Sequence, residues 1–116
     1  MLAQGALLRY CAEKGIIVEG YGVIGADDVL TQPAIRQLAS DLGRTEAQVA
    51  LRHTLQRGAR AGGSPNVVVL AKSLTKRRID ENLRVFDFEL DNAAMRALDQ
   101  LASSEGRSYW DNTDVP

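Results

Sequence analysis

The stretch VVVLAKSLTKRRIDEN, residues 67 to 82, joins an apolar run to a cluster of cations. Lys72 follows the apolar run almost directly, and Lys76, Arg77 and Arg78 stand next to one another a few residues later. In parallel α/β proteins, ligands bind beyond the carboxyl ends of the strands. A helix that begins there adds unpaired backbone N–H groups, which attract anions. The pattern therefore favours an anion-binding site at the end of a strand.

The other side chains in this stretch suit a nitrogenous base beside a phosphate. Lys72 offers a point charge, and Arg78 offers a planar fork that binds phosphate or stacks on a flat ring. The hydroxyl of Ser73 can donate a hydrogen bond. Glu81 and Asn82 can pair with the amino and ring-nitrogen edge of adenine. Phosphate and base together describe a nucleotide.

A structural alternative explains the same charges without a ligand. Lys76 and Asp80 stand four residues apart, as do Arg77 and Glu81, which is the spacing of ion pairs on a solvated helix face. Spacing alone leaves both interpretations open.

The composition restricts the classes of partner. The chain has 116 residues, of which 45% are hydrophobic and 25% charged, and its formal net charge is −1. This length suits one small domain or a piece of a larger one. A near-neutral chain whose basic cluster is one helical turn wide is not expected to bind nucleic acid. No apolar stretch approaches the roughly 18 residues of a membrane span, and no signal peptide is evident. We therefore expect a cytoplasmic chain without membrane contact.

The single cysteine and the single histidine are expected to pack in the interior. Cys11 cannot form an internal disulfide and fits a reducing compartment. His53 by itself supplies too few ligands for a metal site, so no metal is expected.

Turn signals and apolar spacing predict the order helix, strand, two helices, strand, two helices. The expected bounds are a helix ending at Gly15, a strand from Ile16 to about Tyr21, a helix from Pro33 to Gly43, a helix from the Thr45–Gln48 capping box to Gly58, a strand over residues 67–71, and helices capped by Thr75 and Asp91. The expected inward-facing sets are Ile35, Leu38 and Leu42; Ile79, Leu83 and Phe86; and Ala94, Leu98 and Leu101.

Strands that alternate with helices indicate a parallel sheet in an α/β fold. The uniformly apolar second strand predicts that both of its faces are covered. Two parallel strands cannot close on themselves and leave two open edges. Either copies of the chain assemble, or the chain is part of a larger sheet, and we favour the second explanation.

Three segments resemble, in this order, the C-terminal part of an aldo-keto reductase. They are LLRYCAEKGIIVEGYGVIG, TEAQVALRHTLQRG and VVVLAKSLTKRRIDENLRVFDFELDNAAMRALDQL, and the resemblance covers residues 5 to about 101. The pattern K-S-x-x-x-x-R-I-x-E-N followed by V-F-D-F-E-L is its most specific part. The resemblance implies a (β/α)8 TIM barrel, of which this chain holds the seventh and eighth strands with a C-terminal helix and tail. Residues 1–116 would be a partial barrel, with helices and two strands in 1–101 and a C-terminal loop in 102–116.

The resemblance also implies NADP(H) as cofactor, without metal, and a small aldehyde or ketone as substrate of the parent protein. Lys72, Ser73 and Arg78 would hold the 2′-phosphate that distinguishes NADPH from NADH. Arg78 would also lie over the adenine, and Glu81 and Asn82 would face its edge.

Further positions match residues that contact the rest of the cofactor in this family. Tyr21 would stack on the nicotinamide, and the backbone from Gly22 to Gly25, which includes Ile24, would run along the pyrophosphate. Leu74 belongs to the same cofactor segment, at a position that is often aromatic or β-branched in the family. Trp110, in the C-terminal loop, could form a wall of the substrate pocket.

The four catalytic residues of the family, an aspartate, a tyrosine, a lysine and a histidine, have no matching positions in this chain. The chain is therefore interpreted as the NADP(H)-binding part of a reductase. Two alternatives stay open: a non-catalytic, cofactor-binding partner subunit of the same fold, and a truncated fragment without independent function. In isolation the chain is expected to self-associate through its open strand edges.

Overall fold

The computed structural model describes residues 5–25, 29–62 and 66–101 of the chain, without the side chains of residues 61 and 62. The predicted tail and Trp110 lie outside the described residues. The elements are α1 (Gly5–Glu13), β1 (Val18–Tyr21), the short 3₁₀ turn η1 (Val29–Thr31), α2 (Pro33–Leu42), α3 (Glu46–Gly62), β2 (Val67–Leu70), α4 (Lys76–Leu83), a second 3₁₀ turn η2 (Arg84–Phe86) and α5 (Asn92–Gln100). Apart from the two 3₁₀ turns, which were not predicted, their order and type are those predicted from the sequence, which confirms the α/β character of the chain.

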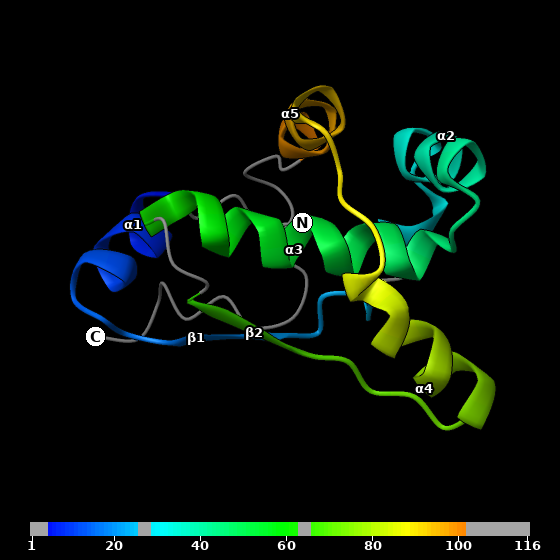
Figure 1. Cartoon of the computed structure of the whole chain (residues 1–116), viewed down its shortest axis with the longest axis horizontal. Coiled ribbons are helices and arrows are strands. Elements are labelled where there is room, and N and C mark those ends of the chain that lie inside the picture. Colours follow the sequence, from blue (N-terminus) through cyan, green and yellow to red (C-terminus); the bar gives the residue numbers. More distant parts are fainter. Residues whose placement is uncertain (1–4, 26–28, 63–65, 102–116) are drawn as a thin grey trace, which may run out of the picture.

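The long helix α3 is the centre of the fold. It lies between the two-stranded sheet on one side and helices α2 and α5 on the other (Figure 1). The two strands pair in parallel, with Val18 opposite Val67 and Tyr21 opposite Leu70. The predicted parallel pairing is confirmed, and both strands end at the same edge of the sheet.

Three helix ends lie where the sequence predicts them and are fixed by local contacts, whereas the Thr75 side chain, at the N-cap of α4, makes no capping hydrogen bond. At the head of α3 the Thr45 N–H donates to Gln48 Oε1 at 3.0 Å, and the Gln48 N–H donates to Thr45 Oγ1 at 3.2 Å. This is the reciprocal capping box. At the head of α5 the Ala94 N–H donates to Asp91 Oδ1 at 2.7 Å. Helix α2 ends at Gly43, whose φ of 60° is left-handed.

Gly58 does not end α3, which continues to Gly62. A methyl group at Gly58 would lie 2.4 Å from Cγ2 of Val67, so the missing side chain makes room for β2. The glycine was predicted as a helix stop, whereas the structure uses it for close packing between helix and strand.

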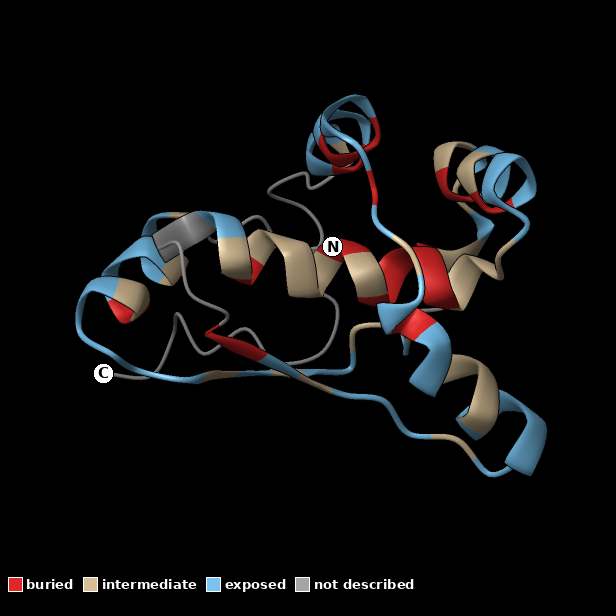
Figure 2. Cartoon of the chain, viewed as in Figure 1, coloured by how far each residue is buried: buried red, intermediate tan, exposed pale blue. Residues whose placement is uncertain are grey.

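The apolar core lies between α2, α3 and α5, on the side of α3 that faces away from the sheet (Figure 2). Its buried members are Val29, Ile35, Ala39, Val49, Ala50, Leu90, Ala94, Met95 and Leu98. Leu38 and Leu101 are half-buried and pack against it, as predicted. Leu42 is exposed, contrary to the prediction, because it is the last residue of α2 and lies beyond the reach of this core.

The prediction that both faces of the second strand are covered is wrong for this chain. Val67 is buried beside α3, but Val68 and Leu70 are 47% and 45% exposed. Side chains alternate between the two faces of a strand, so one face packs on α3 and the other has no covering layer in the described part of the chain.

Helix α4 also leaves its apolar side uncovered. Ile79, Leu83 and Phe86 were predicted to face inward, yet all three are exposed. The segment that follows β2 runs away from the sheet, and α4 returns from there toward α3 (Figure 1). Most of the helix therefore lies apart from the core between α2 and α5, and these side chains meet no apolar partner layer among the described residues.

Candidate functional site

Two of the predicted site segments begin at the carboxyl edge of the two strands. The parallel register places Tyr21 opposite Leu70, the last residue of β2, and the segment from Lys72 onward continues from that edge into α4. Tyr21 is 80% exposed, so its ring is available to a ligand.

The chain turns sharply after Tyr21. Gly22 has a φ of 68°, a conformation that L side chains rarely adopt, and the Gly25 N–H donates to the Gly22 carbonyl at 3.0 Å. Ile24 in this turn is partly buried and packs against the apolar core. The core therefore anchors the turn, while the backbone at Gly22 stays exposed at the strand edge.

Both ion pairs of the solvated-helix alternative are present. Lys76 Nζ donates to Asp80 Oδ2 at 2.6 Å, and Arg77 Nη1 donates to Glu81 Oε1 at 2.7 Å. These contacts pair two cations of the cluster, Lys76 and Arg77, with carboxylates, and they do not involve Lys72 or Arg78.

Lys72 and Arg78 are exposed and form no ion pair with any described residue. Between them lies the start of α4, where no side chain caps the first backbone N–H groups. Ser73 Oγ accepts from the Thr75 N–H at 3.4 Å, which leaves the Ser73 hydroxyl proton free to donate elsewhere. Two uncompensated cations, a hydroxyl and an uncapped helix start make this region suited to an anion.

The predicted adenine-facing residues lie along α4. Glu81 and Asn82 are half-buried, and Leu74, before the helix, is exposed. One carboxylate oxygen of Glu81 accepts from Arg77, and the main-chain carbonyl of Glu81 accepts from Gln48 Nε2 at 2.9 Å.

A row of polar side chains on α3, which was not predicted from the sequence, forms hydrogen bonds with the main chain between Glu81 and Leu90. Its members recur at every fourth residue, and each donates to a main-chain carbonyl: Gln48 to Glu81 at 2.9 Å, Arg52 to Val85 at 3.5 Å and Gln56 to Leu90 at 2.9 Å. The signal that could have revealed the row is the repeat of long polar side chains on one face of a helix that is otherwise largely buried.

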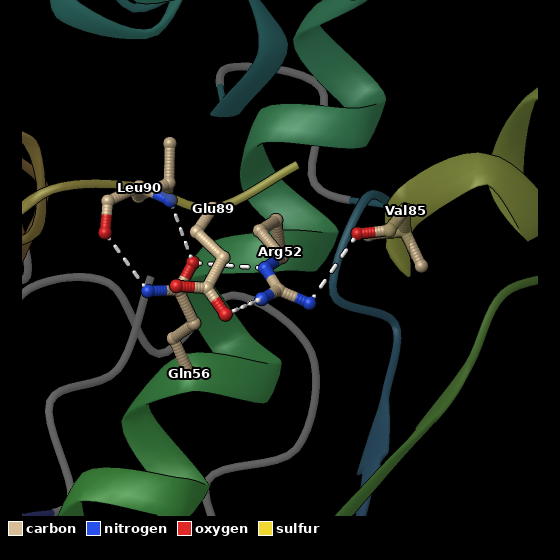
Figure 3. A network of polar contacts seen from close by, with 5 residues as sticks. All are labelled: Arg52, Gln56, Val85, Glu89 and Leu90. Carbon is tan, nitrogen blue, oxygen red and sulfur yellow. Dashed lines mark hydrogen bonds and ion pairs between the residues drawn. The ribbon is translucent and has the colours of Figure 1, made fainter. Parts of the chain in front are cut away.

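Figure 3 shows two members of this row, Arg52 and Gln56, with their partners. Gln56 Oε1 accepts from the Leu90 N–H at 2.8 Å and from Arg52 Nε at 2.9 Å. Arg52 Nη2 lies 3.1 Å from Oε1 of Glu89, whose side chain is largely exposed. The row therefore fixes the main chain between Val85 and Leu90 against α3.

His53 is fully buried and serves packing, as predicted. Its Nε2 lies 2.9 Å from Oδ1 of Asp99. Burial lowers the pKa of His53, and its hydrogen bond to the Asp99 carboxylate opposes that shift only in part. No described group of three or more His, Cys, Asp or Glu side chains is placed to hold a metal ion. None of the described helices is both long and apolar enough to cross a membrane.

The sequence model of the aldo/keto reductase family matches residues 1–103. The chain belongs to the aldo/keto reductase family. Its sequence is 36% identical to estradiol 17 beta-dehydrogenase 5 of Mus musculus over 99% of this chain and 38% of that protein. It is 40% identical to prostaglandin-E(2) 9-reductase of Oryctolagus cuniculus over 86% of this chain and 32% of that protein.

Solved structures agree with this membership. The crystal structure of a Gox0644 mutant in complex with NADPH superposes with a TM-score of 0.84 and 32% sequence identity, over 99% of this chain and 40% of that chain. The aldo/keto reductase chain described here therefore spans less than half of the length of these relatives.

Proposed function

We propose that this chain is the NADP(H)-binding C-terminal part of an aldo/keto reductase, with β1 and β2 as the seventh and eighth strands of a (β/α)8 barrel. Residues 1–116 would belong to that one barrel, and residues 102–116 would form its C-terminal loop. The whole cytoplasmic protein would transfer hydride from NADPH to an aldehyde or ketone. The catalytic aspartate, tyrosine, lysine and histidine would come from earlier strands.

The uncovered apolar surfaces support a larger barrel. Val68 and Leu70 are exposed on the bare face of β2, and Leu83 and Phe86 are exposed on and after α4. Both outer strand edges lack a partner strand among the described residues. Six further βα units would supply strands for the edges and helices for the apolar sides, which is consistent with a chain that spans 38% of a relative's length.

The observation that supports cofactor binding most is the placement of two uncompensated cations beside the carboxyl edge of parallel strands. Lys72 and Arg78 fit a phosphate because an ammonium and a guanidinium without carboxylate partners can both bind its oxygens. Ser73 would add its hydroxyl. These three residues would hold the 2′-phosphate, and NADPH, when bound, would supply the hydride.

The remaining cofactor contacts follow the same edge. Tyr21 would stack on the nicotinamide, and the turn from Gly22 to Gly25, which includes Ile24, would follow the pyrophosphate. Leu74 would contact the cofactor from the segment before α4. The main chain at Gly22 is suited to a close approach because it carries no side chain.

The adenine would lie against α4. Asn82 offers an amide, and Glu81 keeps one carboxylate oxygen beyond the one bound by Arg77. Arg78 would cover the ring with its guanidinium plane.

Calorimetric titration of the full chain with 2′,5′-ADP and with 5′-AMP tests the 2′-phosphate site. The two ligands differ only in that phosphate, so we expect 2′,5′-ADP to bind at least about tenfold more tightly. Lys72→Ala and Arg78→Ala should remove most of this preference. Lys76→Ala removes an equal charge from the same helix start, but its ammonium is already paired with Asp80, so the preference should persist.

The proposal fails if the chain binds neither ligand, or binds both equally. It also fails if Lys76→Ala reduces the preference as much as Lys72→Ala and Arg78→Ala do.

A further inference from the structure

The position of α4 depends on few contacts. The helix has eight residues, and none of them is buried. Isolated helices of this length are marginal in water, so contacts with the rest of the chain must hold α4 in place. Apolar packing contributes little to holding α4 in place, because Ile79 and Leu83 are exposed.

Gln48 supplies a hydrogen bond to this helix from the centre of the fold. Its side chain belongs to α3 and is buried, with only 5% of the residue exposed. Nε2 donates to the Glu81 carbonyl at 2.9 Å, a contact between residues 33 positions apart. The Glu81 carbonyl lies in the last turn of α4 and has no i+4 donor within that helix. It accepts from the backbone N–H of Arg84, the C-cap residue, and Gln48 adds a second donor that comes from α3.

The capping box at the head of α3 fixes which end of the Gln48 amide faces α4. Oε1 accepts from the Thr45 N–H at 3.0 Å. Rotating the amide by half a turn would place its NH₂ group against that N–H and its oxygen against the Glu81 carbonyl. One orientation satisfies both contacts, and the other satisfies neither.

We propose that Gln48 is a positioning residue for the nucleotide site, because it holds the main chain of α4 where Arg78 and Asn82 can meet the adenosine. Those two residues are four positions apart and lie on one side of the helix, while Gln48 bonds the main chain at Glu81 between them. A shift of α4 would therefore move both side chains together. The inference rests on the proposed nucleotide-binding function.

Two matched substitutions separate this role from general stabilisation. Gln48→Met and Gln56→Met each replace an amide of α3 by an apolar side chain of similar volume. Each removes one bond donated to a main-chain carbonyl and at least one accepted from a main-chain N–H. Only Gln48 bonds α4, whereas the main-chain bonds of Gln56 are to Leu90, beyond that helix.

Two measurements on the full chain show whether Gln48 positions α4 for the nucleotide. The first is amide hydrogen exchange over residues 76–84, which we expect Gln48→Met to accelerate and Gln56→Met to leave near the wild-type rate. The second is the affinity ratio of 2′,5′-ADP to 5′-AMP, which Gln48→Met should lower roughly three- to tenfold. Gln56→Met should keep the ratio even if it lowers the unfolding midpoint.

Gln48→Glu separates the capping box from the bond to α4. A carboxylate still accepts from the Thr45 N–H but places an oxygen against the Glu81 carbonyl. We expect the same loss as with Gln48→Met. Recovery of wild-type exchange and selectivity would assign the effect to capping of α3 and overturn the inference.

The remaining outcomes are also decisive. A wild-type chain that prefers 2′,5′-ADP, together with a Gln48→Met variant of unchanged preference, would overturn the role of Gln48 alone. An equal fall in preference for Gln48→Met and Gln56→Met would show general destabilisation and overturn it as well. If wild-type chain binds neither ligand, the proposed function and the nucleotide role of Gln48 fail together, and the exchange rates show only whether Gln48 holds α4.

Discussion

The buried imidazole of His53 ties the middle of α3 to the last turn of α5 through Asp99. Nε2 of His53 lies 2.9 Å from Oδ1 of Asp99, and Arg57 Nε approaches the same oxygen at 3.3 Å. Nδ1 of His53 has no hydrogen-bond partner among the described residues. A second proton on the ring would therefore place an unsatisfied N–H in the interior.

This geometry predicts that the chain loses stability in mild acid. Burial lowers the pKa of His53 below its ordinary value of 6.5, and the charges of Arg57 and Arg60 act in the same direction, while Asp99 opposes them. The unfolded chain therefore binds the proton more readily than the folded chain does. The contribution of His53 is complete above the unfolded pKa and is lost as the pH falls from there toward the lowered folded pKa.

Urea unfolding at about pH 7.5 and about pH 5.5, at fixed protein concentration, measures the effect. His53→Gln should be less stable at the higher pH and should lose less stability on acidification than the wild-type chain. An equal loss in both proteins would show that His53 does not contribute to the acid sensitivity.

Gly58→Ala should destabilise the chain although alanine normally favours a helix. The added methyl would lie 2.4 Å from Cγ2 and 2.7 Å from Cβ of Val67, so α3 and β2 must separate. We expect a loss of about 1–3 kcal/mol in the free energy of unfolding, measured by urea denaturation. Gly5→Ala is the control, because among the described residues a methyl there meets only Arg9 Nη1, at 3.5 Å. Stabilisation by Gly58→Ala would contradict the close packing.

The chain by itself should self-associate through its open strand edges and bare apolar face. Val68 and Leu70 are exposed beside an unpaired edge of β2, the arrangement that favours edge-to-edge pairing. Light scattering after size exclusion should show a mass that rises with concentration. Val68→Lys should shift the population toward the monomer, whereas Gln37→Lys, on the exposed surface of α2, should not. A cooperative, monomeric melt of the wild-type chain at all concentrations would contradict this expectation.

Features with local signals were predictable from the sequence. The capping bonds between Thr45 and Gln48, and from Ala94 to Asp91, join residues three positions apart, so the sequence located both helix starts. The parallel pairing followed from the alternation of strands with helices.

Long-range contacts were not predictable in the same way. Gln48 and Arg52 reach carbonyls 33 positions away, and no local pattern reports such a partner. The apolar run of β2 indicated a tendency toward burial, but it did not reveal whether the chain supplies a second covering layer for Leu70. At the candidate site, by contrast, the contact from Arg77 to Glu81 spans four positions, and its spacing already indicated the ion pair.

The most direct test of the central claim is amide hydrogen exchange of the full chain with NADPH and, separately, with NADH. We expect NADPH to slow exchange in the two segments that follow the strands, residues 22–25 and 72–82, and NADH at the same concentration to protect residues 72–82 much less. The 2′-phosphate is the difference between the two cofactors, and Lys72 and Arg78 are the cations proposed to bind it. Equal protection by both cofactors, or no protection by either, would contradict the proposed 2′-phosphate site at Lys72 and Arg78.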